Sequence, residues 1–181
     1  MQREQTTIMI ETALVAAMAY VLSLVQFGGL WAQGGSISLV MIPIVILAFR
    51  RGWKAGITAG LLVGVLKAML GGYVIHPIQF ILDYPVGYAA IGLAGLFSLS
   101  KERKVLYAVL GISLAAFIRM LAHIVSGVVW FGSYAPEGMP VFQYSLWYNL
   151  SYLLPEVILN SIVIIILVSK RFTLLQPQQS R

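Results

Sequence analysis

Polar side chains that could recognise a ligand gather in three otherwise apolar stretches. Gln79, Asp83 and Tyr84 lie within two helical turns of His76-Pro77, and proline favours the first turn of a helix. Two further sets recur at spacings of three and four residues, which places each set on one helix face: Arg119, His123, Ser126 and Trp130, and Asn149, Tyr152, Glu156 and Asn160. Since a carboxylate among apolar residues needs a cationic or hydrogen-bonding partner, we interpret Asp83 with His123 and Asn149 as the candidate binding site.

Structural pairing is the alternative explanation for these charges. Asp83 or Glu156 can pair with Lys67 or Arg119 inside the protein, and we favour this interpretation for Glu156 and Arg119. A membrane enzyme that uses His123 and Asp83 as acid and base is another alternative. The sequence has no cysteine, no serine nucleophile in a recognised motif and no metal triad, so we expect a protein that is not an enzyme.

The composition indicates that membrane helices carry these residues. The chain of 181 residues is 60% hydrophobic and 10% charged, with a mean hydropathy of +0.90, which lies outside the range of soluble domains. We predict an all-α integral membrane protein with a single domain over residues 1–181. Its six predicted transmembrane helices cover residues 8–28, 37–49, 55–70, 77–99, 105–131 and 145–168. This leaves no room for an ATPase domain, and the basic residues form no aromatic-interleaved patch for nucleic acid.

Lysine and arginine predict the orientation in the membrane. If six spans alternate, all but two of the twelve cationic residues lie on one side: Arg3, Arg50, Arg51, Lys54, Lys101, Arg103, Lys104, Lys170, Arg171 and Arg181. By the positive-inside rule, we expect a multi-pass protein of the cell membrane with both termini in the cytoplasm. The first apolar run also fits a signal peptide, but its removal would leave five spans and break this charge pattern.

Two predicted spans are short. Residues 37–49 reach about 20 Å and residues 55–70 about 24 Å, against a hydrocarbon core of about 30 Å. A recess open to the outside would result, although local thinning of the bilayer is an alternative. We expect the neutral, glycine-rich segment 30–39 to cover that recess as a lid, because a lid over a dry pocket should not bury an unpaired ion. More than half of the aromatic residues fall on the outer side, which favours a stacking site for a planar ligand.

Small residues four positions apart predict close helix packing. Gly56, Gly60 and Gly64 form one such series, which we expect to pack inside the protein. Ala13 and Ala17 form another, for which packing within the bundle and docking to a partner protein both stay open.

Several motifs along nearly the whole chain resemble one family of transport components. They are WAQGGSISLVMIPI (31–44), FRRGWKAG (49–56), ILDYP (81–85), HIVSGVVWFGSYAPEG (123–138) and YSLWYN (144–149). On these motifs the chain is similar to the thiamine-specific substrate-binding (S) components of energy-coupling factor (ECF) vitamin transporters. The resemblance implies six helices and a thiamine pocket in the outer halves of helices four to six, covered by the loop between helices one and two.

The resemblance also implies partners and site residues. The protein would need no cofactor of its own, and ATP would be used only by the partners, which are a membrane coupling protein and two ATP-binding subunits. Ala13 and Ala17 would form the docking surface. The implied thiamine-binding residues are Asp83, Tyr84, Tyr73, His123, Gly127, Trp130, Phe131, Tyr144, Asn149 and Trp31.

The chain departs from some relatives at two of these positions. Asp83 stands where they carry glutamate, so its shorter carboxylate must approach the ligand by about one methylene more. Phe131 stands where they carry tryptophan, which leaves open whether Phe131 or the adjacent Trp130 stacks on the ligand. The ligand itself has alternatives, because the residue types also suit another vitamin or a thiamine precursor.

Overall fold

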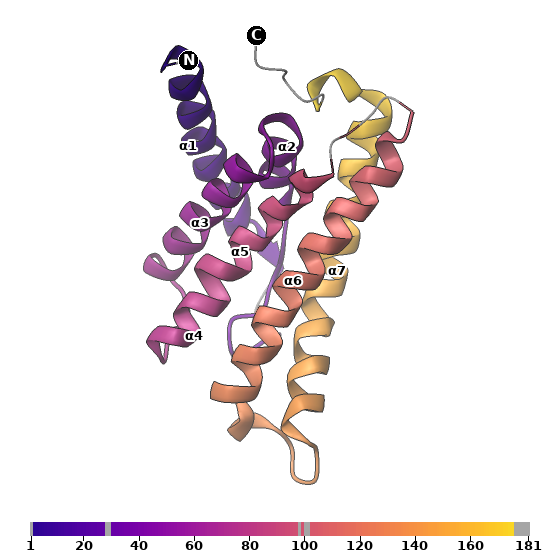
Figure 1. Cartoon of the computed structure of the whole chain (residues 1–181). Helices are drawn as coiled ribbons and strands as arrows, with labels where there is room; N and C mark the ends of the chain where they lie inside the picture. The colour runs from indigo at the N-terminus through magenta and orange to yellow at the C-terminus, as the bar shows by residue number, and fades with distance from the viewer. Residues whose placement is uncertain (1, 28–29, 98, 100–101, 176–181) are drawn as a thin grey trace.

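The fold is a bundle of helices with one very small sheet. The computed structural model describes residues 2–27, 30–97, 99 and 102–175. The helices over these residues are α1 (Gln2–Leu24), α2 (Met41–Arg51), α3 (Trp53–Met69), α4 (Pro77–Ile81), α5 (Gly87–Ala89), α6 (Lys104–Trp130) and α7 (Val141–Lys170). A π-helical turn η1 (Leu82–Val86) and a 3-10 helix η2 (Ala90–Leu96) make α4 to η2 one continuous segment, so the described chain forms six main helical segments. Figure 1 shows them side by side, which confirms the predicted all-α fold with six helices.

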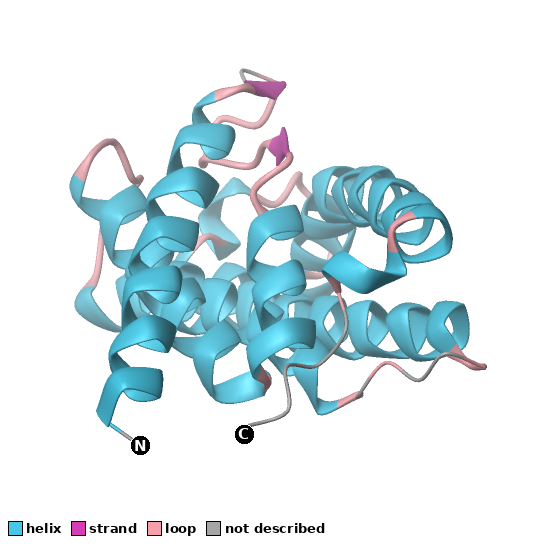
Figure 2. Ribbon diagram, turned by 90° about the horizontal axis from the view of Figure 1, so that it is seen from above, coloured by secondary structure: helices cyan, strands magenta, loops and turns pink. Residues whose placement is uncertain are grey.

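Short elements connect the helices. Strands β1 (Gln26–Phe27) and β2 (Ile37–Ser38) pair antiparallel and lie at one edge of the bundle (Figure 2). Two 3-10 turns follow α6 and α7, at η3 (Gly132–Tyr134) and η4 (Phe172–Leu174).

Several helix ends differ from the predicted ranges. Helix α1 ends at Leu24 and α2 begins only at Met41, because the residues just inside the expected spans pair as strands. Helix α7 begins at Val141, before the apolar run that marked residues 145–168. The expected end of the first span at residue 28 and the cationic residues at 101 and 181 lie outside the described residues.

Proline shapes the fourth segment at both positions where it occurs. His76 caps the helix by accepting a hydrogen bond from the backbone N–H of Ile78, and Pro77 occupies the first turn, which confirms the predicted helix start. Pro85 lies inside the segment and has no N–H to donate. There the helix widens into the π turn, and the Gly87 N–H reaches back five residues to the carbonyl of Leu82. Asp83 stands on this widened turn.

The glycine series of α3 packs against the fourth segment. A Cβ atom at Gly56, Gly60 or Gly64 would collide with backbone atoms of that segment, at Tyr88 for Gly60 and at Tyr84 for Gly64. Glycine therefore lets the two helices approach closely, and the predicted internal packing of this series is confirmed. The contact also fixes the π turn against α3.

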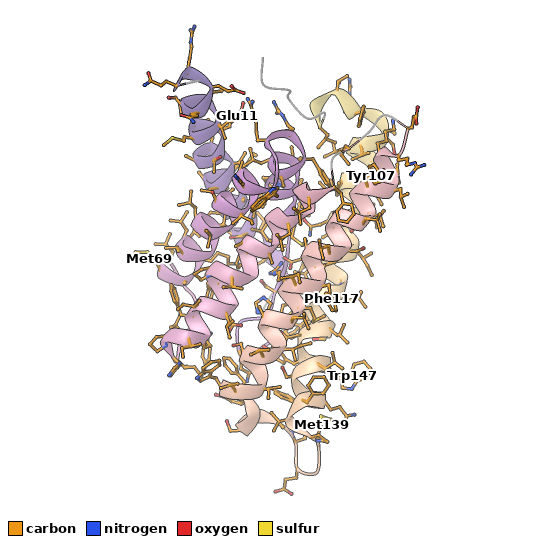
Figure 3. All side chains as sticks on the ribbon, in the orientation of Figure 1. Glu11, Met69, Tyr107, Phe117, Met139 and Trp147 are labelled. Carbon is orange, nitrogen blue, oxygen red and sulfur yellow. The ribbon has the colours of Figure 1, made fainter. Side chains whose placement is uncertain are left out.

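The surface of the bundle is apolar. Met69, Phe117 and Trp147 project outward in Figure 3, and each is more than half exposed. Among the described residues, α1, α6 and α7 are each long and apolar enough to cross a membrane. Such a surface suits lipid rather than water, so the fold is that of a membrane protein.

Short helix α2 lies in the core. Its Met41, Ile44 and Val45 are buried against Ile91 and Ile112 from the fourth segment and from α6. At 11 residues it reaches only about 16 Å, which is shorter than expected and about half of a bilayer core. Ser38, just before α2, is also buried and hydrogen-bonds to Glu156 of α7.

Candidate functional site

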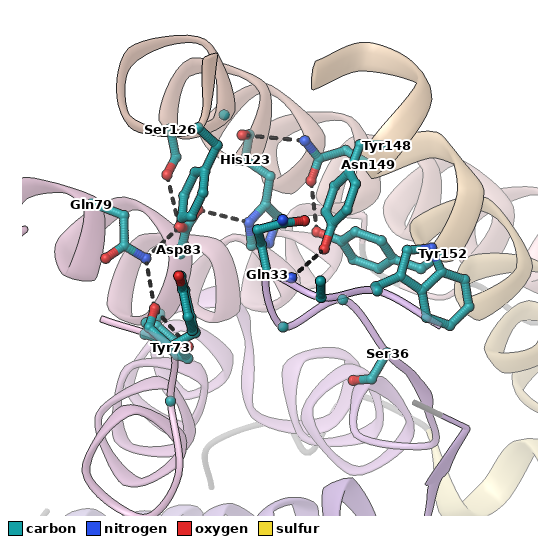
Figure 4. A pocket seen from close by; sticks show the side chains of 18 of the residues that line it. Gln33, Ser36, Tyr73, Gln79, Asp83, His123, Ser126, Tyr148, Asn149 and Tyr152 are labelled. Carbon is teal, nitrogen blue, oxygen red and sulfur yellow. Dashed lines mark hydrogen bonds and ion pairs between the residues drawn. The ribbon is translucent and has the colours of Figure 1, made fainter. Parts of the chain in front are cut away.

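A cavity of about 370 Å³ opens within the bundle. Its wall comes from the loop 31–36, the end of α3, the segment from α4 to α5, the second half of α6 and the first half of α7. Figure 4 shows these elements converging on it. The volume lies in the range of small-molecule sites.

Asp83 is the acidic centre of the cavity wall. Its Oδ2 accepts hydrogen bonds from Gln79 Nε2 at 2.7 Å and Ser126 Oγ at 2.7 Å, and its Oδ1 lies 3.0 Å from His123 Nδ1 (Figure 4). All three partners can donate, and an ionised carboxylate only accepts. The arrangement therefore suits a charged Asp83, with His123 donating from Nδ1.

A second set of hydrogen bonds holds Asn149 next to His123. Asn149 Nδ2 donates to the carbonyl oxygens of Ser145 at 2.9 Å and His123 at 3.4 Å, and Asn149 Oδ1 accepts from Tyr152 Oη at 2.6 Å. His123 Nε2 is buried and has no partner among the described protein atoms. The structure thus brings Asp83, His123 and Asn149 to one cavity, where Asn149 is linked to Asp83 only through His123.

Gly127 brings α6 and α7 together beside these residues. A Cβ there would collide with Ser145 Oγ, whose hydroxyl donates to the carbonyl of Ile124 at 3.0 Å. The absence of a side chain thus allows the close helix approach that holds His123 near Asn149.

Aromatic rings line the cavity on two sides. Phe131 lies just after the end of α6, is buried, and packs 6.0 Å from Tyr73 and 6.3 Å from Tyr134, measured between ring centroids. The hydroxyls of Tyr73 and Tyr134 are 3.4 Å apart, and this hydrogen bond raises the pKa of Tyr73 above its usual value. On the other side, Tyr144 and Tyr148 are 5.9 Å apart.

Trp130 lies elsewhere. Its ring stacks on His76 at 5.1 Å, and it does not belong to the cavity lining, which holds Phe131. The chain turns between these neighbours as α6 ends, so their side chains point in different directions. The sequence left open whether Phe131 or Trp130 lies at the binding site. In the structure Phe131 is the one that lines the cavity.

The loop between α1 and α2 closes over the cavity. Trp31 Nε1 donates to Ser151 Oγ at 2.7 Å, and the backbone N–H of Gln33 donates to Tyr148 Oη at 3.1 Å. Trp31 also packs edge-on against Tyr152, with ring centroids 5.9 Å apart. These contacts attach the loop to α7, in the position expected of a lid.

Arg119 and Glu156 form a buried ion pair at 2.8 Å. Glu156 also accepts from Ser38 Oγ at 2.9 Å, and Asn160 Nδ2 donates to the carbonyl of Ser38 at 2.8 Å. The pair therefore joins α6, α7 and β2, which confirms the structural interpretation of Glu156 and Arg119. Lys67 lies 5.9 Å from the Tyr88 ring centroid and is paired with neither carboxylate.

Nine of the ten expected binding residues line the cavity, with Trp130 as the exception. The lining also includes polar side chains that were not expected at the site from the sequence, among them Gln79, Ser126, Tyr148 and Tyr152. The signal for Ser126 and Tyr152 was present, since both belong to the polar helix faces, and Gln79 lies one turn before Asp83. Among the described residues, no group of three metal-binding side chains is close enough to hold an ion.

Comparison with known proteins identifies the family. The sequence profile described as "Thiamine transporter protein (Thia_YuaJ)" matches residues 9–176. The chain belongs to this thiamine transporter family. It is 40% identical over 179 residues to the thiamine transporter ThiT of Bacillus subtilis (strain 168), covering 92% of each chain. It is 33% identical over 181 residues to ThiT of Lacticaseibacillus paracasei, covering 93% of this chain and 90% of that protein.

A solved structure agrees with the sequence comparison. ThiT from Listeria monocytogenes superposes with a TM-score of 0.86 at 31% sequence identity, over 96% of this chain and 100% of that one. The resemblance inferred from the sequence motifs is thus confirmed. The family members are named as transporters and not as enzymes, which argues against the membrane-enzyme alternative.

Proposed function

We propose that this protein binds thiamine in the cavity around Asp83. The observation that carries the proposal is a carboxylate held by three donors in a cavity with aromatic walls, in a chain of the thiamine transporter family. Thiamine combines a cationic thiazolium with an aminopyrimidine that donates and accepts hydrogen bonds. Aromatic faces stabilise the cation, and Asp83 accepts from the amino group.

The other expected residues complete the proposed site. Phe131 stacks on a ring of the ligand, and His123 and Asn149 contact its polar edge. Tyr73, Tyr84 and Tyr144 surround it, Gly127 allows its close approach to α6, and Trp31 covers it from the loop. Each of these side chains, or the glycine backbone, borders the same cavity.

The proposed direction of transport follows the charge pattern. The start of α1, the junction of α2 and α3, the start of α6 and the end of α7 lie at one end of the bundle, and most cationic residues belong to these ends. With this end in the cytoplasm, both termini are cytoplasmic in a multi-pass protein of the cell membrane. The cavity, built from the opposite halves of α6 and α7, then receives thiamine from outside.

Delivery into the cytoplasm would require partners, in this proposal an ECF membrane coupling protein and two ATP-binding subunits. Ala13 and Ala17 lie on an exposed face of α1, whereas Thr12 and Ala16 face the bundle. An exposed pair of small residues four apart suits close contact with a helix of another protein.

Binding is tested by titrating the purified chain with thiamine and following tryptophan fluorescence. Saturable binding of one thiamine without product formation supports the proposal. If thiamine fails to bind while another vitamin or a thiamine precursor saturates the site, the substrate assignment is wrong.

Docking is tested separately with Ala17→Trp. We expect this variant to bind thiamine normally but to be lost from the complex when it is co-purified with the partner subunits. Val125→Trp places the same indole ring on an exposed face of α6 and should leave the complex intact. Equal recovery of both variants in the complex would refute the docking role of α1.

A further inference from the structure

Gln79 holds two parts of the cavity wall together. It is only 1% exposed, and both its amide nitrogen and its amide oxygen are hydrogen-bonded. Nε2 donates to Asp83 Oδ2 at 2.7 Å and to the carbonyl of Tyr73 at 3.1 Å, while Oε1 accepts from the backbone N–H of Ile75 at 3.1 Å. One amide therefore joins the carboxylate to the loop that carries Tyr73 (Figure 4).

These bonds determine which oxygen of Asp83 is available to a ligand. Oδ2 accepts from both Gln79 and Ser126, and a carboxylate oxygen has two lone-pair directions. Among the described residues Oδ1 has a hydrogen bond only with His123, so it keeps one position for a further donor. The carboxylate thus accepts a single bond from the ligand, on the side of His123.

We propose that Gln79 is a positioning residue for ligand recognition. Its bond to Oδ2 orients the carboxylate so that Oδ1 faces the amino donor of the ligand. Its bond to the carbonyl of Tyr73 fixes the backbone of the neighbouring loop. This inference rests on the proposed binding of thiamine. It gives the short side chain of Asp83 a fixed orientation, because Gln79 lies one helical turn before it on the same face.

Other titratable groups line the cavity that contains Asp83. They are Tyr84 and Tyr88 on its own helical segment, Lys67 of α3, Tyr73 in the loop after α3, Arg119 and His123 of α6, and Tyr144, Tyr148 and Tyr152 of α7. All of them are unchanged in the variants below, so a comparison with wild type at each pH cancels their contribution.

The test is Gln79→Glu, which keeps the shape of the side chain. At high pH two carboxylates would face each other across 2.7 Å, so neither donates and they repel. At low pH they share a proton, and the protonated group again donates to its partner. We expect thiamine to bind at least about tenfold more weakly than to wild type at pH 8.5. At pH 5.5 the bond to Asp83 returns and only the bond to the Tyr73 carbonyl stays lost, so we expect the loss of affinity to be at least about threefold smaller than at pH 8.5.

The measurement is tryptophan fluorescence on the full chain in detergent, with the unfolding temperature of the ligand-free protein taken at each pH. Gln143→Glu makes the same change at an exposed position of α7 and should match wild type at both pH values. Gln79→Met, which has no hydrogen-bonding group, should weaken binding at least tenfold at both pH values.

Two results would overturn the inference. One is an affinity ratio for Gln79→Glu that does not change with pH, because loss of a purely structural amide is not recovered by protonation. The other is a Gln79→Met variant that binds thiamine as wild type does, which decides the matter even if the glutamate variant does not fold. Failure of wild type itself to bind thiamine would instead refute the proposed function.

Discussion

Replacement of Asp83 by asparagine isolates the charge of the proposed site. The side chain keeps its shape, but one acceptor oxygen becomes an amide donor. A hydrogen bond to a charged group contributes about 1.5–3 kcal/mol, and every 1.4 kcal/mol is tenfold in affinity. We therefore expect Asp83→Asn to weaken thiamine binding roughly 10- to 150-fold.

The fold should tolerate this change. Ser126 Oγ can rotate and accept from the new amide, so only the bond to Gln79 or His123 is lost. Loss of one such bond to the carboxylate costs about 1.5–3 kcal/mol, which is a minor part of the stability of a domain. The unfolding temperature without ligand should therefore fall by roughly 3–12 °C.

The assay is a thiamine titration of the purified chain by tryptophan fluorescence, with Trp31 at the cavity as the natural reporter. Glu137→Gln makes the same chemical change in the exposed loop between α6 and α7 and should bind as wild type. An Asp83→Asn variant that is folded and binds within twofold of wild type would show that the carboxylate does not recognise thiamine.

Three further changes test other parts of the structure. Phe131→Ala should weaken thiamine binding about tenfold, whereas Trp130→Ala should leave it within about threefold, because only Phe131 lines the cavity; equal losses in titration would contradict this geometry. Gly35→Ala should speed thiamine release in stopped-flow fluorescence, since its Cβ would meet Tyr152 of α7 at 2.7 Å and displace the lid; an unchanged rate would refute the lid contact. Glu156→Gln should lower stability by about 3–5 kcal/mol in thermal unfolding because it leaves the buried Arg119 charge unpaired, and a change below about 1 kcal/mol would contradict a dry ion pair.

The helices and their polar faces could be predicted because both follow from local patterns. The length of an apolar run indicates the length of a membrane helix. Polar residues that recur every three or four positions indicate that they share one face of that helix. His76-Pro77 marked a helix start for a similarly local reason, and the glycine series of α3 marked a close contact because small residues four apart leave a flat surface.

Irregular backbone was less predictable. Pro85 signalled a missing hydrogen bond, but the sequence did not say that the helix would widen into a π turn over Leu82–Val86. The strand pair that shortens α1 and α2 was also missed, because each strand has only two residues and shows no alternation. Both features depend on neighbouring helices that the local sequence does not reveal.

The sequence by itself determined a membrane bundle with a carboxylate, a histidine and an asparagine on inward faces, since lipid excludes such side chains. It did not determine which groups meet the carboxylate. Only the tertiary structure shows that Oδ2 of Asp83 accepts hydrogen bonds from Gln79 and Ser126, while Oδ1 is hydrogen-bonded to His123. It also shows that Phe131 lines the cavity and Trp130 does not. The physical reason is that a hydrogen bond tolerates only a few tenths of an ångström of variation in the distance between donor and acceptor. That distance depends on how the helices rotate and cross.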